Sequence, residues 1–313
     1  MSPADVAKSS LDILSLRFFV VSFLPTFAGT WFLLTLVWAG APGNRIDFGT
    51  AWATTAKLGA GQVLLIVLAV VLVSLLLTPV QLAAVRLLEG RWPRWPRAAG
   101  RWWQLRRKKR LQALAEPAEF DEGTQPAPEA VLRAAEAGEL LSRRFPHDDH
   151  LVRATALGNA LTAMEDTAGR VYGFDAVVAW PRLYVVLGDR MRAIVDDRRD
   201  VLDSSARTAV TGAFVAAVSA ALLLRSGPWL LLTLAPAAIG VLAYSGARRA
   251  AESYAEAVRA AFDLHRFDLI GSLHLPLPAT PADEVTVNKA LCDLWRQGVP
   301  FEDPYHHPGQ ADK

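Results

Sequence analysis

Five polar residues between positions 159 and 182 are of the types used in proton transfer or phosphate binding: Asn159, Glu165, Asp166, Asp175 and Arg182. Asn159 and Asp166 are seven residues apart, so a helix would place them on one face. Carboxylates beside an arginine could act as acid and base, or hold a phosphate near lipid headgroups. The alternative, which we prefer, is a polar network that locks helices together, with Asp175 and Arg182 paired.

The run from His147 to His150, His-Asp-Asp-His, contains ligand types that suit zinc or manganese. Neighbouring side chains diverge, so four consecutive residues cannot all reach one ion, and we expect a solvated loop. We predict no metal site and no cofactor. The sequence also contains no P-loop, HExxH, GxSxG or paired-cysteine motif, which favours a non-enzymatic protein.

The segment from Arg86 to Arg110 combines ten basic residues and four tryptophans with one acid. Basic residues gather on the cytoplasmic flank of a membrane span, and tryptophan favours the headgroup level. We therefore predict contact with anionic lipid headgroups. Arginine with tryptophan could also bind RNA, but the net charge of only +2 makes a nucleic-acid partner the weaker hypothesis. The predicted headgroup contacts are Arg91, Trp92, Arg94, Trp95, Arg97, Arg101, Trp102, Trp103, Arg106 and Arg107.

Long apolar runs predict how these residues are positioned. About 20 apolar residues cross a bilayer core as a helix. Such runs cover about 18–39, 58–80, 208–224 and 229–245. The predicted fold is an all-α integral membrane protein with two transmembrane hairpins (four helices) and a helical cytoplasmic region. The predicted parts are a first hairpin (1–85), a cytoplasmic segment (86–204), a second hairpin (205–246) and a C-terminal region (247–313).

The basic flank at 86–110 sets the orientation. Positive residues stay on the cytoplasmic side, so both termini are expected there, in the plasma (inner) membrane of a bacterium. Residues 41–57 would then be a turn-rich connection outside. Residues 116–129, acidic and rich in proline, predict a flexible loop.

Helices are expected from Pro128 to about Arg144, and from Arg190 without a break to Leu224, the first half of which would protrude as a stalk. A corner is expected at Trp180, before Pro181. Small residues at Gly212, Ala216 and Ala220 predict close helix packing, against the hairpin partner or, as the alternative, in a dimer. In the tail, Tyr254, Val258, Phe262, His265 and Leu269 would line one helix face.

Several motifs together resemble one family. They are RLLEGRWP from Arg86, LGN from Leu157 with Glu165, YGFD from Tyr172 with WPRL from Trp180, and FDLHR from Phe262. This combination resembles a family of uncharacterised bacterial four-span membrane proteins, except that Arg91 stands where an aromatic residue would be expected. The resemblance implies the four-span architecture over most of the chain and implies no activity.

Three functions follow as expectations. The first is a non-enzymatic anchor or assembly platform that binds a cytoplasmic protein or its own copies. The second is an oligomeric channel or pore, suggested by alanine- and glycine-rich spans. The third is a membrane-surface enzyme that uses the five polar residues near lipid headgroups.

Overall fold

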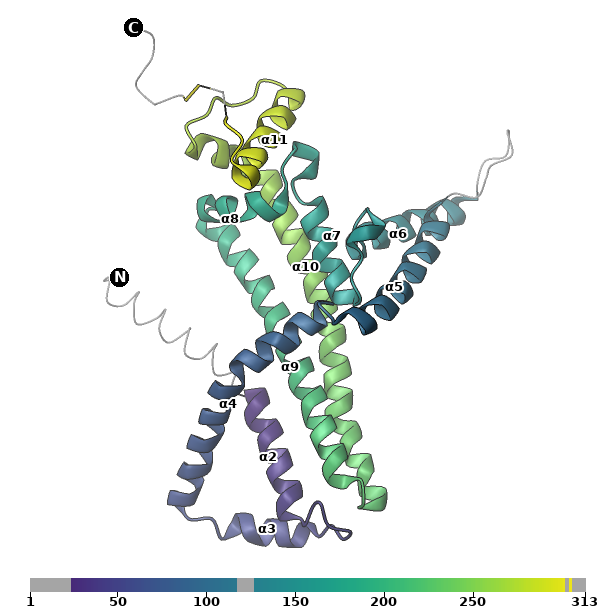
Figure 1. Cartoon of the computed structure of the whole chain (residues 1–313), viewed down its shortest axis with the longest axis vertical. Helices are drawn as coiled ribbons and strands as arrows, with labels where there is room; N and C mark the ends of the chain where they lie inside the picture. The colour runs from purple at the N-terminus through teal and green to yellow at the C-terminus, as the bar shows by residue number, and fades with distance from the viewer. Residues whose placement is uncertain (1–23, 117–126, 302–303, 306–313) are drawn as a thin grey trace. The chain divides into compact units, whose positions relative to one another are not determined.

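The computed structural model describes residues 24–116, 127–301 and 304–305, with the backbone alone at 73–82. Regular structure in these residues is helical, without a strand (Figure 1). This confirms the all-α prediction. The α-helices are α2 (Leu24–Trp38), α3 (Phe48–Ala56), α4 (Ala60–Leu88), α5 (Arg94–Ala115), α6 (Pro128–Arg144), α7 (Ala156–Thr167), α8 (Ala176–Val186), α9 (Asp189–Leu223), α10 (Leu234–Ser272) and α11 (Pro281–Gln297). The short 3-10 helices in the described ranges are η2 (Asp149–Leu151), η3 (Arg170–Tyr172) and η4 (Gly227–Thr233).

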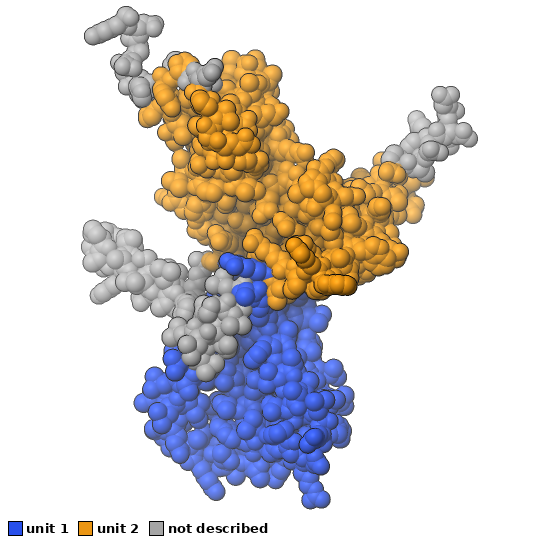
Figure 2. All heavy atoms as spheres, viewed as in Figure 1, with its two compact units in different colours: residues 1–86, 203–247 blue, residues 87–202, 248–313 orange. Residues whose placement is uncertain are grey.

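The chain divides into two compact units (Figure 2). Unit 1 comprises residues 1–86 and 203–247, and unit 2 comprises residues 87–202 and 248–313. Helix α9 begins in unit 2 and ends in unit 1, whereas α10 begins in unit 1 and ends in unit 2. Unit 1 has the larger fraction of apolar residues, whereas unit 2 holds most of the charged residues.

Among the residues that the structure describes, two helical segments are long and apolar enough to cross a membrane: Asp189–Leu223 and Gly227–Ser272. A third candidate is the pair Phe48–Ala56 and Ala60–Leu72, whose axes are bent by 110° at the break between them. Helix α2 is apolar but shorter, and the start of the span predicted at 18–39 lies outside the described residues. Length and composition thus support association with a membrane.

Unit 1 contains a close approach of two helices. A Cβ added at Gly212 of α9 would lie 2.8 Å from the Cα of Gly240 on α10. Only a hydrogen at both positions lets the two backbones come this near. Ala216 and Ala220, the other small residues of the predicted ridge, are half-buried.

Four local predictions need correction. Residues 41–57 are not only a connection, because α3 forms there with Asp47 as its N-cap, accepting from the Gly49 amide at 2.8 Å. Trp180 is not a corner, because α8 runs through Pro181, whose ring removes only one helical amide donor. The fourth apolar run, predicted to end at about 245, and the helix of the C-terminal region form one continuous helix, α10.

The fourth correction concerns the predicted buried face of the tail helix. Tyr254, Val258, Phe262 and Leu269 are buried as expected. His265, expected to be a hydrogen-bonded core histidine, has the hydrogen-bond partner, because its Nδ1 lies 2.7 Å from an Asp268 carboxylate oxygen, but it is only half-buried. The acidic loop predicted over 116–129 falls mainly on 117–126, outside the described residues.

The sequence motifs named above contact one another, and the first contact joins RLLEG to LGN. The Thr155 hydroxyl donates to the Leu88 carbonyl at 2.6 Å, and a Cβ at Gly158 would lie 2.0 Å from the Glu89 carbonyl oxygen. The RLLEG and LGN motifs are thus one joint, which fixes the chain just before α5 against the start of α7.

A second joint links the remaining motifs. The ring of Phe262 packs against Phe174 and Trp180, with centroids 6.0 and 6.1 Å away. The Tyr172 hydroxyl donates to Asp263 at 2.9 Å, and the Asn288 amide on α11 donates to the Tyr172 carbonyl at 2.8 Å. These contacts hold α8, α10 and α11 together around the YGFD turn.

Candidate functional site

Helix α5 carries most of the predicted headgroup contacts, and a buried lysine fixes it to the rest of unit 2. Lys108 is almost fully buried, and its ammonium donates to the His147 carbonyl at 2.6 Å and to the Asp149 carboxylate at 2.7 Å. The Lys108 hydrogen bond lowers the pKa of Asp149, although desolvation opposes it. The run His147–His150 is exposed, as expected for a loop, but it also anchors α5.

One face of α5 borders a cationic cavity of about 520 Å³. We call it the α5 cradle. Four of the residues predicted from the basic segment line it: Arg91, Trp92, Arg97 and Arg101. The segment before α7 completes it, and the further lining residues are Gly90, His150, Leu151, Val152 and Arg153.

The arginines of the cradle are only partly neutralised. Arg91 lies 3.6 Å from a Glu89 carboxylate oxygen, and Arg101 donates to the Asp149 carbonyl at 2.9 Å. The Nε of Arg101 is buried without a hydrogen-bond partner in the described part of the chain. No acidic residue is among the described residues that line the cradle. Its positive charge therefore suits an anion. A guanidinium can donate to two phosphate oxygens at once, which favours phosphate.

Exposed tryptophans lie along the same helix. Trp95 is 91% exposed, and Trp102 and Trp103 are about half exposed. The guanidinium of Arg106 lies 3.7 Å from the ring centre of Trp102, and that of Arg107 lies 4.8 Å from the ring centre of Trp103. Such exposed aromatic rings under arginines suit the headgroup level of a bilayer, where the ring stays among lipid and the charge meets phosphate. Arg94 is exposed at the first turn of α5.

Of the five polar residues considered for chemistry, Asn159 is structural in its contacts. It is fully buried, accepts from the Arg153 amide at 2.6 Å and donates to the Arg153 carbonyl at 3.3 Å. These bonds hold Arg153, a cradle residue, in its loop. Asn159 thus shapes the cradle from behind without facing it.

Glu165, Asp166 and Asp175 line a second cavity of about 590 Å³, together with Cys292 of α11; Leu151 and Arg153 line both this cavity and the cradle. We call it the Cys292 cleft. Its basic side chains are Arg153, Arg170, Lys289 and Arg296, and Asp293 adds a fourth acid. Asp166 accepts from Arg170 at 3.2 Å and from the His147 amide at 2.8 Å. Desolvation raises the pKa of Glu165, while Arg153 and Arg91 oppose this shift.

Asp175 and Arg182 are not paired, contrary to our expectation. Asp175 forms its ion pair with Arg296 and caps α8 by accepting from the Val177 amide at 2.9 Å. Arg182 donates to the Val178 carbonyl and lies 4.5 Å from the ring centre of Trp295. Both residues therefore bind α11 separately, and Arg182 does not line the Cys292 cleft.

The Cys292 cleft is lined by four acidic and four basic side chains, two pairs of which form ion pairs, whereas no acidic side chain lines the cradle among the described residues. Within the described ranges, no cluster of three His, Cys, Asp or Glu side chains could hold a metal ion. Sequence reasoning missed His150 and Arg153 as cradle residues, because nothing in the local sequence shows that they approach α5.

Comparisons with protein-family models, with curated proteins and with solved structures found no match to this chain.

Proposed function

We propose that the chain is a four-span anchor or assembly platform of the bacterial plasma membrane that holds anionic lipid headgroups in the α5 cradle. Both termini and unit 2 would lie on the cytoplasmic side. The candidate spans at Asp189–Leu223, Gly227–Ser272 and the bent pair support a multi-pass arrangement, with α2 as the fourth member. The motif resemblance to four-span bacterial proteins agrees with it.

The α5 cradle is the observation that carries this proposal. Its arginines are incompletely paired, and exposed tryptophans continue along the same helix. Each arginine or lysine near an anionic membrane surface contributes roughly 1 kcal/mol of attraction. Several arginines on one rigid helix would therefore select anionic over zwitterionic lipid.

The test is retention of lipid by the full-length protein during native mass spectrometry from mild detergent. The protein is equilibrated with equal amounts of phosphatidylglycerol and phosphatidylcholine. We expect preferential retention of phosphatidylglycerol. The double substitution of Arg91→Gln and Arg97→Gln, both exposed, should reduce it about thirtyfold, because two attractive charges of roughly 1 kcal/mol each are lost.

A matched control removes two exposed arginines of unit 2 that lie outside the cradle, Arg133→Gln and Arg190→Gln. This control should retain phosphatidylglycerol like the wild type. Equal retention by the cradle variant and the wild type would refute headgroup binding in the cradle.

The platform role predicts a protein partner, either further copies of the chain or a cytoplasmic protein. Light scattering in nanodiscs, with the lipid and scaffold mass subtracted, measures the number of copies. A defined oligomer would mean that the chain binds its own copies. Ion-flux assays would then follow, since the alternative function, a channel, needs several copies. A monomer would contradict self-assembly and the multi-subunit pore.

A further inference from the structure

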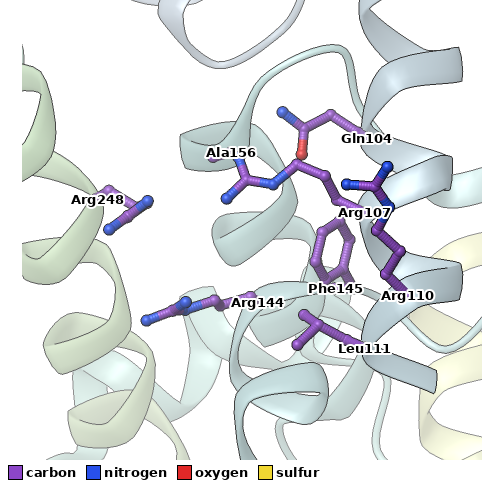
Figure 3. A pocket seen from close by; sticks show the side chains of 8 residues that line it. All are labelled: Gln104, Arg107, Arg110, Leu111, Arg144, Phe145, Ala156 and Arg248. Carbon is purple, nitrogen blue, oxygen red and sulfur yellow. The ribbon is translucent and has the colours of Figure 1, made fainter. Parts of the chain in front are cut away.

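A third pocket of unit 2 is surrounded by four arginines from three helices (Figure 3). Arg107 and Arg110 come from α5, Arg144 is the last residue of α6, and Arg248 lies on α10. The remaining wall consists of Gln104, Leu111, Phe145 and Ala156. We call this the arginine pocket. Residues of helix α5 line both this pocket and the α5 cradle, but no single residue lines both.

Positive charge in the arginine pocket exceeds what nearby acids compensate. Arg144 donates to the Glu252 carboxylate at 2.9 Å. Among the residues that the structure describes, Arg107, Arg110 and Arg248 have no carboxylate within ion-pair distance. Several guanidiniums that face one cavity repel each other, and an anion between them would relieve this repulsion.

Two polar atoms at the pocket are buried without partners. Gln104 is only 3% exposed, and its Oε1 has no hydrogen-bond partner in the described part of the protein. The same holds for Nε of Arg248. Buried polar groups in folded proteins nearly always have partners, so an unpartnered amide oxygen and an unpartnered guanidinium nitrogen in the wall of one pocket indicate a place for a polar ligand.

We propose that the arginine pocket binds a phosphate monoester group. Arg107, Arg144 and Arg248 would hold the phosphate oxygens, and Gln104 would bond a hydroxyl of the ligand. A monoester carries about −1.5 to −2 charges at neutral pH, which matches the unpaired arginines better than a singly charged diester does. Guanidiniums donate to two phosphate oxygens at once, which favours phosphate over smaller anions.

The size of the pocket agrees with one charged group. Its cavity is about 220 Å³. Pockets that enclose whole drug-sized ligands measure about 300–1,000 Å³. The same phosphate chemistry is offered by the headgroup of phosphatidic acid and by free phosphate, so the experiment must separate these two sources. The proposal is independent of headgroup binding in the cradle.

The experiment measures the unfolding midpoint of the full-length protein in mild detergent against ligand concentration. The probes are inorganic phosphate, short-chain phosphatidic acid and short-chain phosphatidylglycerol, each at ionic strength matched with sodium chloride. Phosphate and phosphatidic acid should raise the midpoint in a saturable way. Arg248→Gln should raise the half-saturating concentration about tenfold or more, because a charge-assisted bond to phosphate is lost.

Two further variants make the outcome decisive. Lys109→Gln removes one exposed charge of α5 outside the pocket and should respond like the wild type. Arg107→Gln removes a half-buried pocket arginine that would hold the phosphate, so it tests the site even if Arg248→Gln does not fold.

The half-saturating concentrations of the two ligands show where the bound phosphate group comes from. Saturation by phosphatidic acid at a lower concentration than by phosphate assigns a lipid headgroup, and the reverse order assigns a free phosphate compound. Three results would overturn the proposal. They are an equal response of the wild type and both pocket variants to phosphate, no stabilisation of the wild type by either phosphate or phosphatidic acid, and an equal effect of phosphatidylglycerol and phosphatidic acid. Loss of lipid retention in the cradle variant with an intact phosphate response would separate the two sites.

Discussion

The ammonium of Lys108 lies 2.7 Å from a carboxylate oxygen of Asp149, with the lysine side chain 2% exposed and the aspartate 55% exposed. This ion pair fixes the middle of α5, the helix that borders both cationic cavities. A buried lysine needs such a partner, since an unpaired buried charge is strongly destabilising.

Removal of the carboxylate tests this role. Asp149→Ala leaves the buried ammonium with the His147 carbonyl alone, which should lower the free energy of unfolding by about 1–3 kcal/mol. Thermal unfolding at neutral pH measures the loss. The adjacent exposed substitution Asp148→Ala is the control and should change little.

The same pair predicts a pH dependence. Since folding lowers the pKa of Asp149 from its ordinary 3.8, the stabilisation is complete above that value and is lost as the pH falls through the lower folded-state pKa. The difference in unfolding free energy between wild type and Asp149→Ala should be constant near neutrality and shrink below pH 3.8. A difference that stays constant in acid would show that the carboxylate charge does not contribute.

Gly158 should tolerate no side chain. A Cβ there would lie 2.0 Å from the Glu89 carbonyl oxygen, so Gly158→Ala must separate α7 from the RLLEG turn, at a cost of about 1–3 kcal/mol or more. The matched control is Gly271→Ala on α10, which meets nothing within 4 Å and should stabilise the helix by about 0.5–1 kcal/mol. Chemical unfolding distinguishes the two. Equal stability of both variants would contradict the joint between the motifs.

Asp175 should couple to Arg296 and not to Arg182. Asp175→Ala loses the cap of α8 and should destabilise unit 2 by about 1 kcal/mol, whereas Asp175→Asn keeps a capping side chain and should cost less. Double-mutant cycles of Asp175→Asn with Arg296→Gln and with Arg182→Gln measure the coupling. A larger coupling with Arg182 would restore the pairing that the sequence suggested.

How far the sequence determines this fold varies between elements. Helix α6 was predicted at its observed bounds because Pro128 suits a first turn and Phe145-Pro146 ends the helix. Helix α9 was expected as one long helix and is one. Helix α3 was missed because it has nine residues and its main signal is the capping side chain of Asp47.

The cradle shows the same limit. Arg91, Trp92, Arg97 and Arg101 belong to one segment, so composition alone identified them. Arg153 reaches them only because the start of α7 lies beside the chain before α5. The Thr155 hydrogen bond to Leu88 holds this contact, and the missing side chain of Gly158 leaves room for it. Contacts between residues about 60 positions apart leave no periodic pattern in a single sequence.

Cys292 should be an unreactive thiol in the folded protein. Burial raises its pKa above the ordinary 9.0, which the Asp175 amide only partly opposes, so little thiolate forms at neutral pH. Labelling with a disulfide reagent at pH 7.5 should be slow in the folded protein and fast after denaturation. Rapid labelling of the folded protein would mean that the Cys292 cleft exposes a reactive sulfur.

The orientation of the four-span proposal can be read in intact cells. Asn44 is exposed in the turn before α3, and Lys109 is exposed on α5. In a Cys292→Ser background, a membrane-impermeant maleimide should label Asn44→Cys directly and Lys109→Cys only after permeabilisation. The opposite pattern would show that the protein has the inverted orientation, with the cradle on the outer side of the membrane.

Photo-crosslinking with headgroup-activatable lipids tests headgroup binding by the α5 cradle most directly. The full-length protein is reconstituted in nanodiscs with a phosphatidylglycerol or a phosphatidylcholine probe, and the crosslinked peptides are identified by mass spectrometry. We predict that phosphatidylglycerol labels residues 91–103 and 150–153 more strongly than phosphatidylcholine does. Equal labelling by the two probes, or labelling confined to other parts of the chain, would contradict the account.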